Sequence, residues 1–348
     1  MTSGKQVIRV GVVGAGANTR DKHIPGLRAQ PGVEVLSVVN SSRASSEKVA
    51  RELSIPQVAD SWRALVEDSG IDAVMIGTWP YLHCPITLAA LAAGKHVLTE
   101  ARIAMNAAEA RQMFVAAQAR PDLIAQVVPA PYTLGVDRTV QRLLREGFLG
   151  RLLTIEVRVA DGKFLDSAAP LNWRQDADLS GLNMMSLGIW YESVMRWVGE
   201  ANSVTAKGRT FVTQRVDAAG RLRAVRVPEH VVVLADMVCG AQATFTVSAV
   251  TGLMKSSEIV LCGSEGTLRF ADGHLYGARK GDAALQAVPI PADEAGGWRV
   301  EEEFINAIRG IEPVSHTSFA DGVKYMEFTE AVVRSMAEGR ELAVPLSG

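Results

Sequence analysis

Cysteine is scarce in this chain, and no apolar run is long enough to cross a membrane. Three cysteines are spread over 348 residues without the spacing of a metal site, and the six histidines form no metal-binding pair. We therefore expect free thiols in a reducing compartment and no structural metal. No stretch of 18 apolar residues occurs, so the sequence predicts no transmembrane helix.

The chain also lacks an excess of charge of one sign. The 36 Lys and Arg residues face 38 Asp and Glu residues, for a formal net charge of −2. This balance gives no electrostatic reason to expect nucleic acid or an anionic membrane as a partner. Residues 1–6 lack the apolar stretch of a signal peptide, so we expect a cytoplasmic protein. The hydrophobic content of 48% is ordinary for a globular protein, and the length suggests two domains.

Short apolar runs alternate with helical patterns in the first third of the chain. The runs lie at residues 7–13, 33–39, 73–76, 96–98 and 124–128. The helical patterns lie near residues 20–30, 44–53, 61–68, 85–93 and 107–119. This alternation predicts an α/β fold with a doubly wound parallel sheet. We assign residues 1–128 to a dinucleotide-binding Rossmann domain.

The pattern changes near Pro129. From residue 152 apolar residues recur at every second position, and candidate hairpins surround Cys239-Gly240 and the turn at residues 263–266. Helices are expected around residues 181–198, 300–309 and 320–337. We assign residues 129–348 to an α+β substrate and oligomerisation domain with a largely antiparallel open sheet. Because such a sheet needs cover on both faces, we expect a homodimer or homotetramer.

A glycine-rich turn joins the first strand to the first helix. Gly14 permits a tight turn, and Gly16 lets a pyrophosphate approach the backbone at the helix N-terminus. Thr19 stands where a third small residue is usual. The strand–turn–helix context predicts a bound dinucleotide, and a purely structural turn is the alternative.

The second strand ends at Asn40, Ser41, Ser42 and Arg43, where an NAD site usually has an acidic residue. An amide, two hydroxyls and a guanidinium could surround a 2′-phosphate without repelling it. The sequence therefore predicts NADP as the cofactor, with NAD possible. A solvated loop is the alternative.

Several further stretches stand in a fairly specific order and spacing. With Gly14-Ala-Gly16 they are His23-Ile-Pro-Gly-Leu27, Thr78-Trp-Pro-Tyr-Leu-His83, Ala93-Gly-Lys-His-Val-Leu-Thr-Glu100, Trp173-Arg174, Ser180-Gly181 through Gly188, and Phe304-Ile-Asn-Ala-Ile-Arg309. Together they resemble the Gfo/Idh/MocA oxidoreductases over nearly the whole chain.

The resemblance implies a Rossmann domain followed by an α/β domain whose open sheet often mediates oligomers. It also implies a substrate, often a sugar or cyclitol, that lies between the two domains. With the motifs above, it gives the expected cofactor-binding residues. They are Gly14, Gly16, Ala17, Asn18, Asn40, Ser41, Ser42, Arg43, Thr78, His83 and Glu100.

The departures from the family pattern concern the catalytic residues. The family's Glu-Lys-Pro appears as Glu100-Ala101-Arg102, so the lysine that usually contacts the reacting hydroxyl is absent. The aspartate and the proton-accepting histidine of Asp-x-Gly-x-His are replaced by Ser186 and Trp190. The usual alcohol-dehydrogenase arrangement is therefore missing.

Four residues are the remaining candidates for the reaction site. Helix geometry predicts that Asn183, Ser186, Trp190 and Ser193 share one face, which has hydrogen-bonding groups and an aromatic wall but no group titrating near neutrality. The candidates are Tyr132 as a phenolic acid, Arg102 as an anchor for an anionic substrate, Asn183, and Trp190 as a pocket wall on which a flat ligand stacks. The alternatives are core packing for the two aromatic residues and a solvated strand end for Arg102.

The sequence thus predicts an NADP(H)-dependent oxidoreductase acting on a carbonyl or alcohol of a small polar or aromatic substrate in an interdomain cleft. The proton-transfer site is atypical. Two alternatives stay open: a cofactor-binding sensor or regulator without hydride transfer, and a lyase or hydrolase using tightly bound NAD(P) for transient oxidation. The expected partners are a small-molecule substrate and further copies of the chain.

Overall fold

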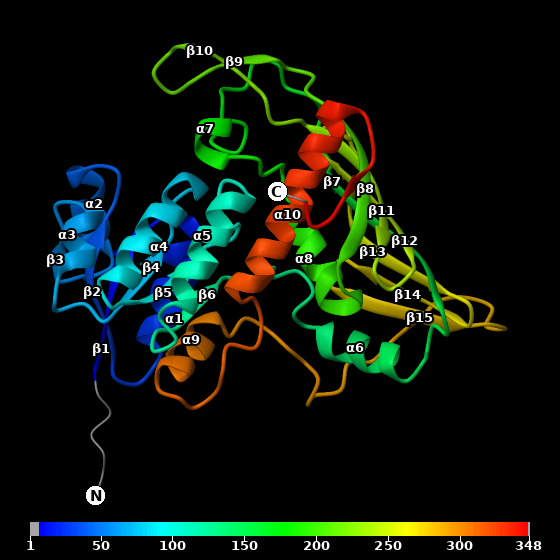
Figure 1. The fold of residues 1–348 in the computed structure, drawn as a ribbon, viewed down its shortest axis with the longest axis horizontal. Helices are drawn as coiled ribbons and strands as arrows, with labels where there is room; N and C mark the ends of the chain where they lie inside the picture. Colours follow the sequence, from blue (N-terminus) through cyan, green and yellow to red (C-terminus); the bar gives the residue numbers. More distant parts are fainter. Residues whose placement is uncertain (1–6, 347–348) are drawn as a thin grey trace, which may run out of the picture. The chain divides into compact units, whose positions relative to one another are not determined.

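The computed structural model describes residues 7–346, and the chain divides into two compact units (Figure 1). The first unit comprises Met1–Pro129 and Arg299–Val323, and the second comprises Ala130–Trp298 and Lys324–Gly348. The sequence division at residue 128 places Arg299–Val323 with the second domain, whereas its contacts place it in the first. The reason is that Thr317 accepts a hydrogen bond from the backbone N–H of Val127, and Gln126 donates to Glu303.

The first unit contains a six-stranded parallel sheet with the order β3-β2-β1-β4-β5-β6. The strands are β1 Ile8–Val13, β2 Val33–Val39, β3 Gln57–Val58, β4 Ala73–Ile76, β5 His96–Thr99 and β6 Ala125–Val127. The order runs outward from β1 in both directions, which is the doubly wound Rossmann arrangement. The predicted parallel sheet is confirmed. β3 was not predicted, because two residues are too few to give an apolar pattern.

Helices cover both faces of this sheet. A continuous helical segment over residues 17–28 contains a π-helical turn, Thr19–His23, followed by α1 Ile24–Arg28. The others are α2 Arg43–Glu52, α3 Trp62–Glu67, α4 His83–Ala92, α5 Ala107–Gln118 and α9 Val300–Ile308, with a short 3₁₀ turn at Pro80–Leu82. Ser42, Ser61 and Asn106 begin α2, α3 and α5 as N-caps, each accepting a hydrogen bond from the backbone three residues on.

The second unit contains a nine-stranded sheet with the order β16-β15-β14-β13-β7-β12-β11-β8-β17. The strands are β7 Leu152–Asp161, β8 Ala201–Arg209, β11 His230–Met237, β12 Gln242–Ser248, β13 Lys255–Gly263, β14 Gly266–Ala271, β15 His274–Arg279, β16 Gln286–Ala287 and β17 Leu342–Ala343. Only the pairing of β7 with β12 is parallel within the described part of this sheet. The prediction of a largely antiparallel sheet with two hairpins is confirmed.

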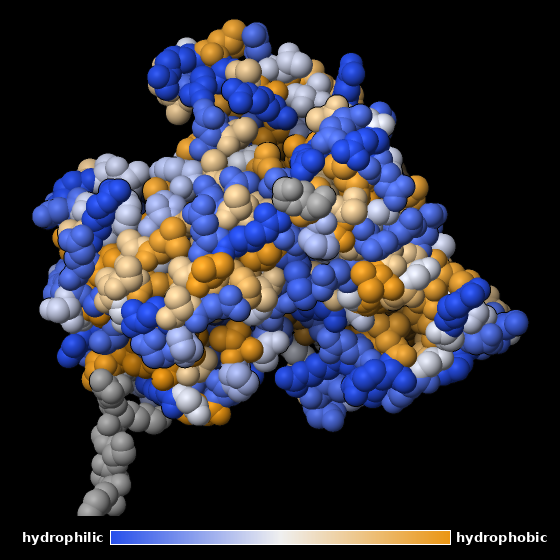
Figure 2. All heavy atoms as spheres, viewed as in Figure 1, coloured by the Kyte–Doolittle hydropathy of each residue, from blue (hydrophilic) through white to orange (hydrophobic). Residues whose placement is uncertain are grey.

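Two helices pack against one face of this sheet. They are α8 Leu187–Val198 and the C-terminal part of α10 Phe319–Glu338. Tyr191 of α8 stacks on Phe328 of α10 with ring centroids 3.6 Å apart, and both rings contact Phe245 of β12. On the other face the alternation of β11 leaves Val232 and Leu234 exposed. Figure 2 shows apolar and polar side chains interspersed over the visible surface of both units.

The expected helix over residues 181–198 is interrupted. The chain forms α7 Ala177–Ser180, leaves the helix at Gly181 with φ +66°, and begins α8 only at Leu187. Met185 in the connection also has a positive φ, +46°. Positive φ values are incompatible with a continuing right-handed helix, so the single-helix prediction was wrong. The helix α6 Asp137–Arg145 was not predicted.

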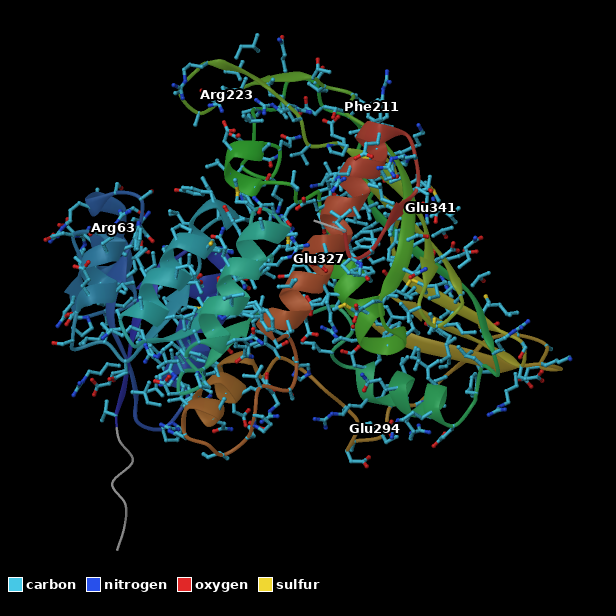
Figure 3. The ribbon with its side chains drawn as sticks, in the orientation of Figure 1. Arg63, Phe211, Arg223, Glu294, Glu327 and Glu341 are labelled. Carbon is cyan, nitrogen blue, oxygen red and sulfur yellow. The ribbon has the colours of Figure 1, made fainter. Side chains whose placement is uncertain are left out.

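A small hairpin projects from the second unit and is held by ion pairs. It consists of β9 Gln214–Val216 and β10 Leu222–Ala224. Arg223, labelled in Figure 3, ties it to α7 through Asp178, with the two groups 2.8 Å apart. In the same hairpin Arg215 of β9 pairs with Glu229 at 3.0 Å, and both side chains are buried. In the part of the chain from residue 7 to residue 346, no helix is both long and apolar enough to cross a membrane.

Candidate functional site

The turn after β1 requires a glycine at position 14. Gly14 has φ +85°, and a Cβ there would lie 2.7 Å from the backbone nitrogen of Thr78. Its own N–H donates to the carbonyl of Val39 at the end of β2. A side chain at this position would break the contact between the loops that follow β1 and β4.

Gly16 is different, because the protein leaves space above it. A Cβ there would meet only the carbonyl oxygen of Gly77, at 3.9 Å. Gly16, Ala17 and Asn18 are exposed at the start of the helical segment over residues 17–28. An exposed backbone at a helix N-terminus fits the approach of a pyrophosphate.

Thr19, the departure from the usual glycine pattern, is accommodated by a second glycine. Thr19 is buried, and a Cβ added at Gly77 would collide with its hydroxyl oxygen. The motif usually has a small residue at position 19. Here position 19 is a threonine, and the missing side chain of Gly77 leaves room for it. Sequence reasoning missed Gly77, since a lone glycine after a strand has many possible causes.

The loop after β2 contains all four predicted residues, and the side chains of two of them form hydrogen bonds within the protein. Asn40 Oδ1 accepts a hydrogen bond from the backbone N–H of Ala15 at 2.7 Å, which ties this loop to the glycine turn. Ser42 Oγ is occupied as the N-cap of α2. Ser41 and Arg43 are exposed, and Arg43 forms ion pairs with Glu47 and Asp60.

Thr78 and His83 lie in the segment that follows β4. His83 is fully buried, with Nε2 2.9 Å from the carbonyl oxygen of Thr78 and Nδ1 2.9 Å from that of Arg102. Burial lowers the pKa of His83, which favours the neutral ring, and a neutral ring donates from one nitrogen at a time. His83 thus lies between the loops after β4 and β5 and contacts one carbonyl oxygen of each.

Three buried threonine hydroxyls have no hydrogen-bond partner among residues 7–346. Thr87 Oγ1 lies within α4, whereas Thr78 Oγ1 lies beside Gly14 and Thr99 Oγ1 lies at the end of β5. Buried hydroxyls are normally hydrogen-bonded, and the last two lie at the carboxyl ends of strands, where doubly wound sheets bind ligands. The residues present therefore fit a dinucleotide, which carries many polar groups.

Glu100 forms a cluster with His23, Asn18 and Glu301. His23 Nε2 lies 3.0 Å from Glu100 Oε1, and its Nδ1 lies 2.5 Å from Glu301 Oε1. Asn18 Nδ2 donates to Glu100. Burial works to lower the pKa of His23, but the hydrogen bonds and charges of the two carboxylates outweigh it and raise the pKa to about 9. Burial likewise works to raise the pKa of Glu100, and His23 and Asn18 outweigh it, so that pKa is lowered.

Arg102 follows Ala101 through a cis peptide bond. It is 4% exposed, so the alternative of a solvated strand end was wrong. The short apolar run before it gave no sign of this burial, because the chain turns inward after the strand has ended.

The second unit brings two of the predicted catalytic residues together. Tyr132 and Trp190 stack with ring centroids 4.6 Å apart and an interplanar angle of 11°. Trp190 is 2% exposed, whereas Tyr132 is 45% exposed. The expectation that a ligand stacks on Trp190 is therefore corrected: Tyr132 covers the indole and presents the exposed aromatic ring.

Asn183 is not on the helix face that was expected. It lies between α7 and α8, fully buried, and its Nδ2 donates to the carbonyl of Ser180 at 2.7 Å. Glu192 is also buried; it accepts hydrogen bonds from the backbone of Ala130 and from Arg196. No group of three potential metal ligands occurs in the part of the chain that the structure describes.

Comparison with known proteins agrees with this geometry. Residues 8–127 match the model of the oxidoreductase family with an NAD-binding Rossmann fold, and residues 138–269 match the GFO/IDH/MocA C-terminal domain. Trans-1,2-dihydrobenzene-1,2-diol dehydrogenase of Sus scrofa is 27% identical over 76% of this chain and 74% of that protein. Levoglucosan dehydrogenase of Pseudarthrobacter phenanthrenivorans is 24% identical over 91% of this chain and 90% of that protein.

The solved structures show the same fold. Levoglucosan dehydrogenase in complex with NADH superposes with a TM-score of 0.86 at 23% identity, covering 98% of this chain and all of that one. The two family models follow one another along the chain as the two units do. The chain therefore belongs to the Gfo/Idh/MocA family and is an oxidoreductase with an NAD-binding Rossmann domain.

Proposed function

We propose that this oxidoreductase uses NADP(H), with NAD(H) as a weaker cofactor, and acts on an alcohol or carbonyl of a small ring-shaped substrate. The observation that carries the proposal is the glycine turn, where Gly16 leaves the backbone open while Gly14 admits no side chain. The unpartnered hydroxyl of Thr78 lies beside it. When bound, the cofactor supplies a carbon that accepts or donates hydride.

The residues that would hold the cofactor come from the carboxyl ends of β1, β2, β4 and β5. Gly14, Gly16, Ala17 and Asn18 would bind the pyrophosphate, and the loop at residues 40–43 would bind the adenosine ribose. Thr78 and Glu100 would lie toward the nicotinamide, with His83 holding Thr78 in place.

Preference for NADP(H) is supported by the loop after β2. It offers no carboxylate to the ribose hydroxyls, and its exposed cation is Arg43. The Arg43 side chain is 57% exposed, and exposed ion pairs such as those with Glu47 and Asp60 are weak because water screens them. A 2′-phosphate could therefore replace these partners at little cost.

The proposed substrate is a ring bearing an alcohol or carbonyl, because Tyr132 offers a half-exposed aromatic face backed by Trp190. The relatives named above are dehydrogenases of a cyclic diol and of levoglucosan. These names favour net oxidation or reduction over a sensor or a lyase. Ala101 and Trp190 replace the family's lysine and histidine, so we assign the proton transfer to the phenol of Tyr132. Arg102 and Asn183 remain proposed contributors to the reaction site.

Absorbance at 340 nm tests the proposal. We expect the protein to reduce NADP⁺ in the presence of trans-dihydrodiols or anhydrosugars, with slower reduction of NAD⁺. A folded protein that binds the cofactor but shows no change in absorbance with any cyclic alcohol or ketone would contradict it.

We also propose a cytoplasmic homodimer or homotetramer. The exposed apolar residues Val232 and Leu234 lie in the interior strand β11, on the face opposite α8. The three cysteines are unpaired, as is usual in a reducing compartment.

A further inference from the structure

The cluster formed by Asn18, His23, Glu100 and Glu301 joins three parts of the first unit that are far apart in sequence. Asn18 and His23 belong to the helical segment after the glycine turn, Glu100 follows β5, and Glu301 lies on α9. Gly26 makes room for this arrangement, because a Cβ there would lie 2.6 Å from Glu301 Oε2. A buried histidine between two carboxylates is costly to build unless its charge is used or compensated.

We propose that His23 is a positioning residue of the cofactor site: as an imidazolium held between Glu301 and Glu100, it keeps Glu100 against Asn18 and thereby fixes the cofactor loop. The cofactor loop is defined here as residues 14–18. This inference rests on the proposed function, since it assumes that this loop binds the dinucleotide.

The charge state of His23 decides whether the arrangement holds. The imidazolium donates from both ring nitrogens, to Glu301 at 2.5 Å and toward Glu100 at 3.0 Å. A neutral ring has one N–H, so one nitrogen lone pair would face a carboxylate oxygen at hydrogen-bond distance. Glu100 is the more exposed partner, 15% against 4% for Glu301, so it is the one that moves away. Asn18 Nδ2, which lies 3.2 Å from His23 Nε2, then leaves Glu100 and donates to the Nε2 lone pair, so the link between the cofactor loop and Glu100 is lost.

The other charged groups around the cluster do not take over the role proposed for His23, which is to hold Glu100 against Asn18. His83 faces Glu100 but is neutral, because burial lowers its pKa. On the helical segment of His23, Arg20 is paired with Glu52. On α9, Glu302 is paired with Arg299, and Glu303 receives hydrogen bonds from Gln126 and Ser315.

The proposal predicts that cofactor affinity falls at alkaline pH. The folded-state pKa of His23, about 9, lies above its ordinary value of 6.5. The contribution of the imidazolium is therefore fully present below pH 6.5 and is lost as the pH rises through about 9.

Fluorescence titration with NADPH between pH 7 and 10.5 tests the proposal. In the unchanged protein we expect the affinity to fall about tenfold across a transition near pH 9, as expected for loss of a charge-assisted hydrogen bond. Glu301→Gln keeps an acceptor for His23 but removes a charge, so it should move the transition down by about 1–3 pH units. His23→Gln should abolish the transition.

Glu303→Gln is the matched control, because Glu303 is a buried glutamate on the same helix that does not contact His23. It should leave the transition in place even where it lowers the melting temperature. A purely structural role for the cluster would lower stability in Glu301→Gln without moving the transition in affinity. That result, or an unchanged protein with no transition near pH 9, would overturn the inference. Failure of the folded, unchanged protein to bind NADPH at any pH would instead overturn the proposed function.

Discussion

The proposed preference for NADP(H) over NAD(H) rests on the side chain of Arg43. Arg43→Ala should weaken NADPH binding by about tenfold and leave NADH binding nearly unchanged, because a phosphate–guanidinium pair contributes about 1–3 kcal/mol. Lys48→Ala is the control, since it removes an exposed cation from the same helix, α2. Titrations with both reduced cofactors check this. Equal loss of NADH and NADPH affinity would assign Arg43 to the stability of the loop instead.

Tyr132 is expected to act through its hydroxyl as well as its ring. Tyr132→Phe keeps the stack on Trp190 and removes the phenol, so kcat should fall by about 10²–10⁴-fold while cofactor affinity stays the same. Tyr132→Ala should in addition raise KM, because the exposed aromatic face is lost. A Tyr132→Phe variant with unchanged kcat would leave the residue with a packing role only.

Residue types with a fixed backbone requirement could be predicted, whereas partners far apart in sequence could not. Gly14 and Gly16 were found because the strand–turn–helix context gives each a specific use. His23 stood in a stretch that resembles the family, but its partner Glu301 is 278 residues away. Asn40 was predicted as a cofactor-binding residue, but the hydrogen bond that its side-chain oxygen accepts from the backbone of Ala15 could not be predicted from the sequence.

At the scale of elements, the hairpin β9–β10 depends on one buried ion pair. Glu229 accepts from Arg215 and from the backbone of Phe211 and Val212, and Arg215 also donates to two carbonyls of the segment before α7. Arg215→Met would leave the buried carboxylate without its cation, so the free energy of unfolding should fall by about 3–5 kcal/mol.

Arg223→Ala provides the comparison within the same hairpin. Its nearest partner, Asp178, is 66% exposed, and Asp176 and Asp217 lie farther away, at 3.7 and 3.9 Å, so the loss should be under about 1 kcal/mol. Urea unfolding of both variants measures the two values. Similar losses would mean that the buried pair is not what holds the hairpin.

Long periodic elements were predictable and short or interrupted ones were not. In β12 polar and apolar residues alternate over seven positions, and β11 contains a run of five apolar residues, so the hairpin they form was expected. β16 and β17 have two residues each, too few to show a period. The break between α7 and α8 lies within an apolar stretch that continues the helical pattern, so only the backbone at Gly181 and Met185 reveals it.

At the scale of the whole molecule, the exposed face of the nine-stranded sheet predicts self-association. Val232 and Leu234 are 41% and 43% exposed on an interior strand. We expect light scattering to give a mass of two or four times 37.3 kDa, and Leu234→Lys to reduce it. A mass near 37.3 kDa at all concentrations would count against the proposed oligomer.

The two-domain architecture was predicted from the change in apolar period near residue 129. The assignment of Arg299–Val323 to the first unit could not be predicted, because the amphipathic pattern of α9 does not show which elements it packs against. In the structure α9 packs against α1, and its Glu303 accepts a hydrogen bond from Gln126 of β6.

The dinucleotide site at the glycine turn is tested most directly by fluorescence titration of the unchanged protein and of Gly16→Val with NADPH. Gly16 is exposed and a Cβ there would meet only the carbonyl oxygen of Gly77, at 3.9 Å, so the free energy of unfolding should change by less than about 0.5 kcal/mol. Saturable binding by the unchanged protein and an affinity at least about tenfold weaker in Gly16→Val are the predicted results. Absence of binding by the folded, unchanged protein, or equal affinity in Gly16→Val, would contradict the account.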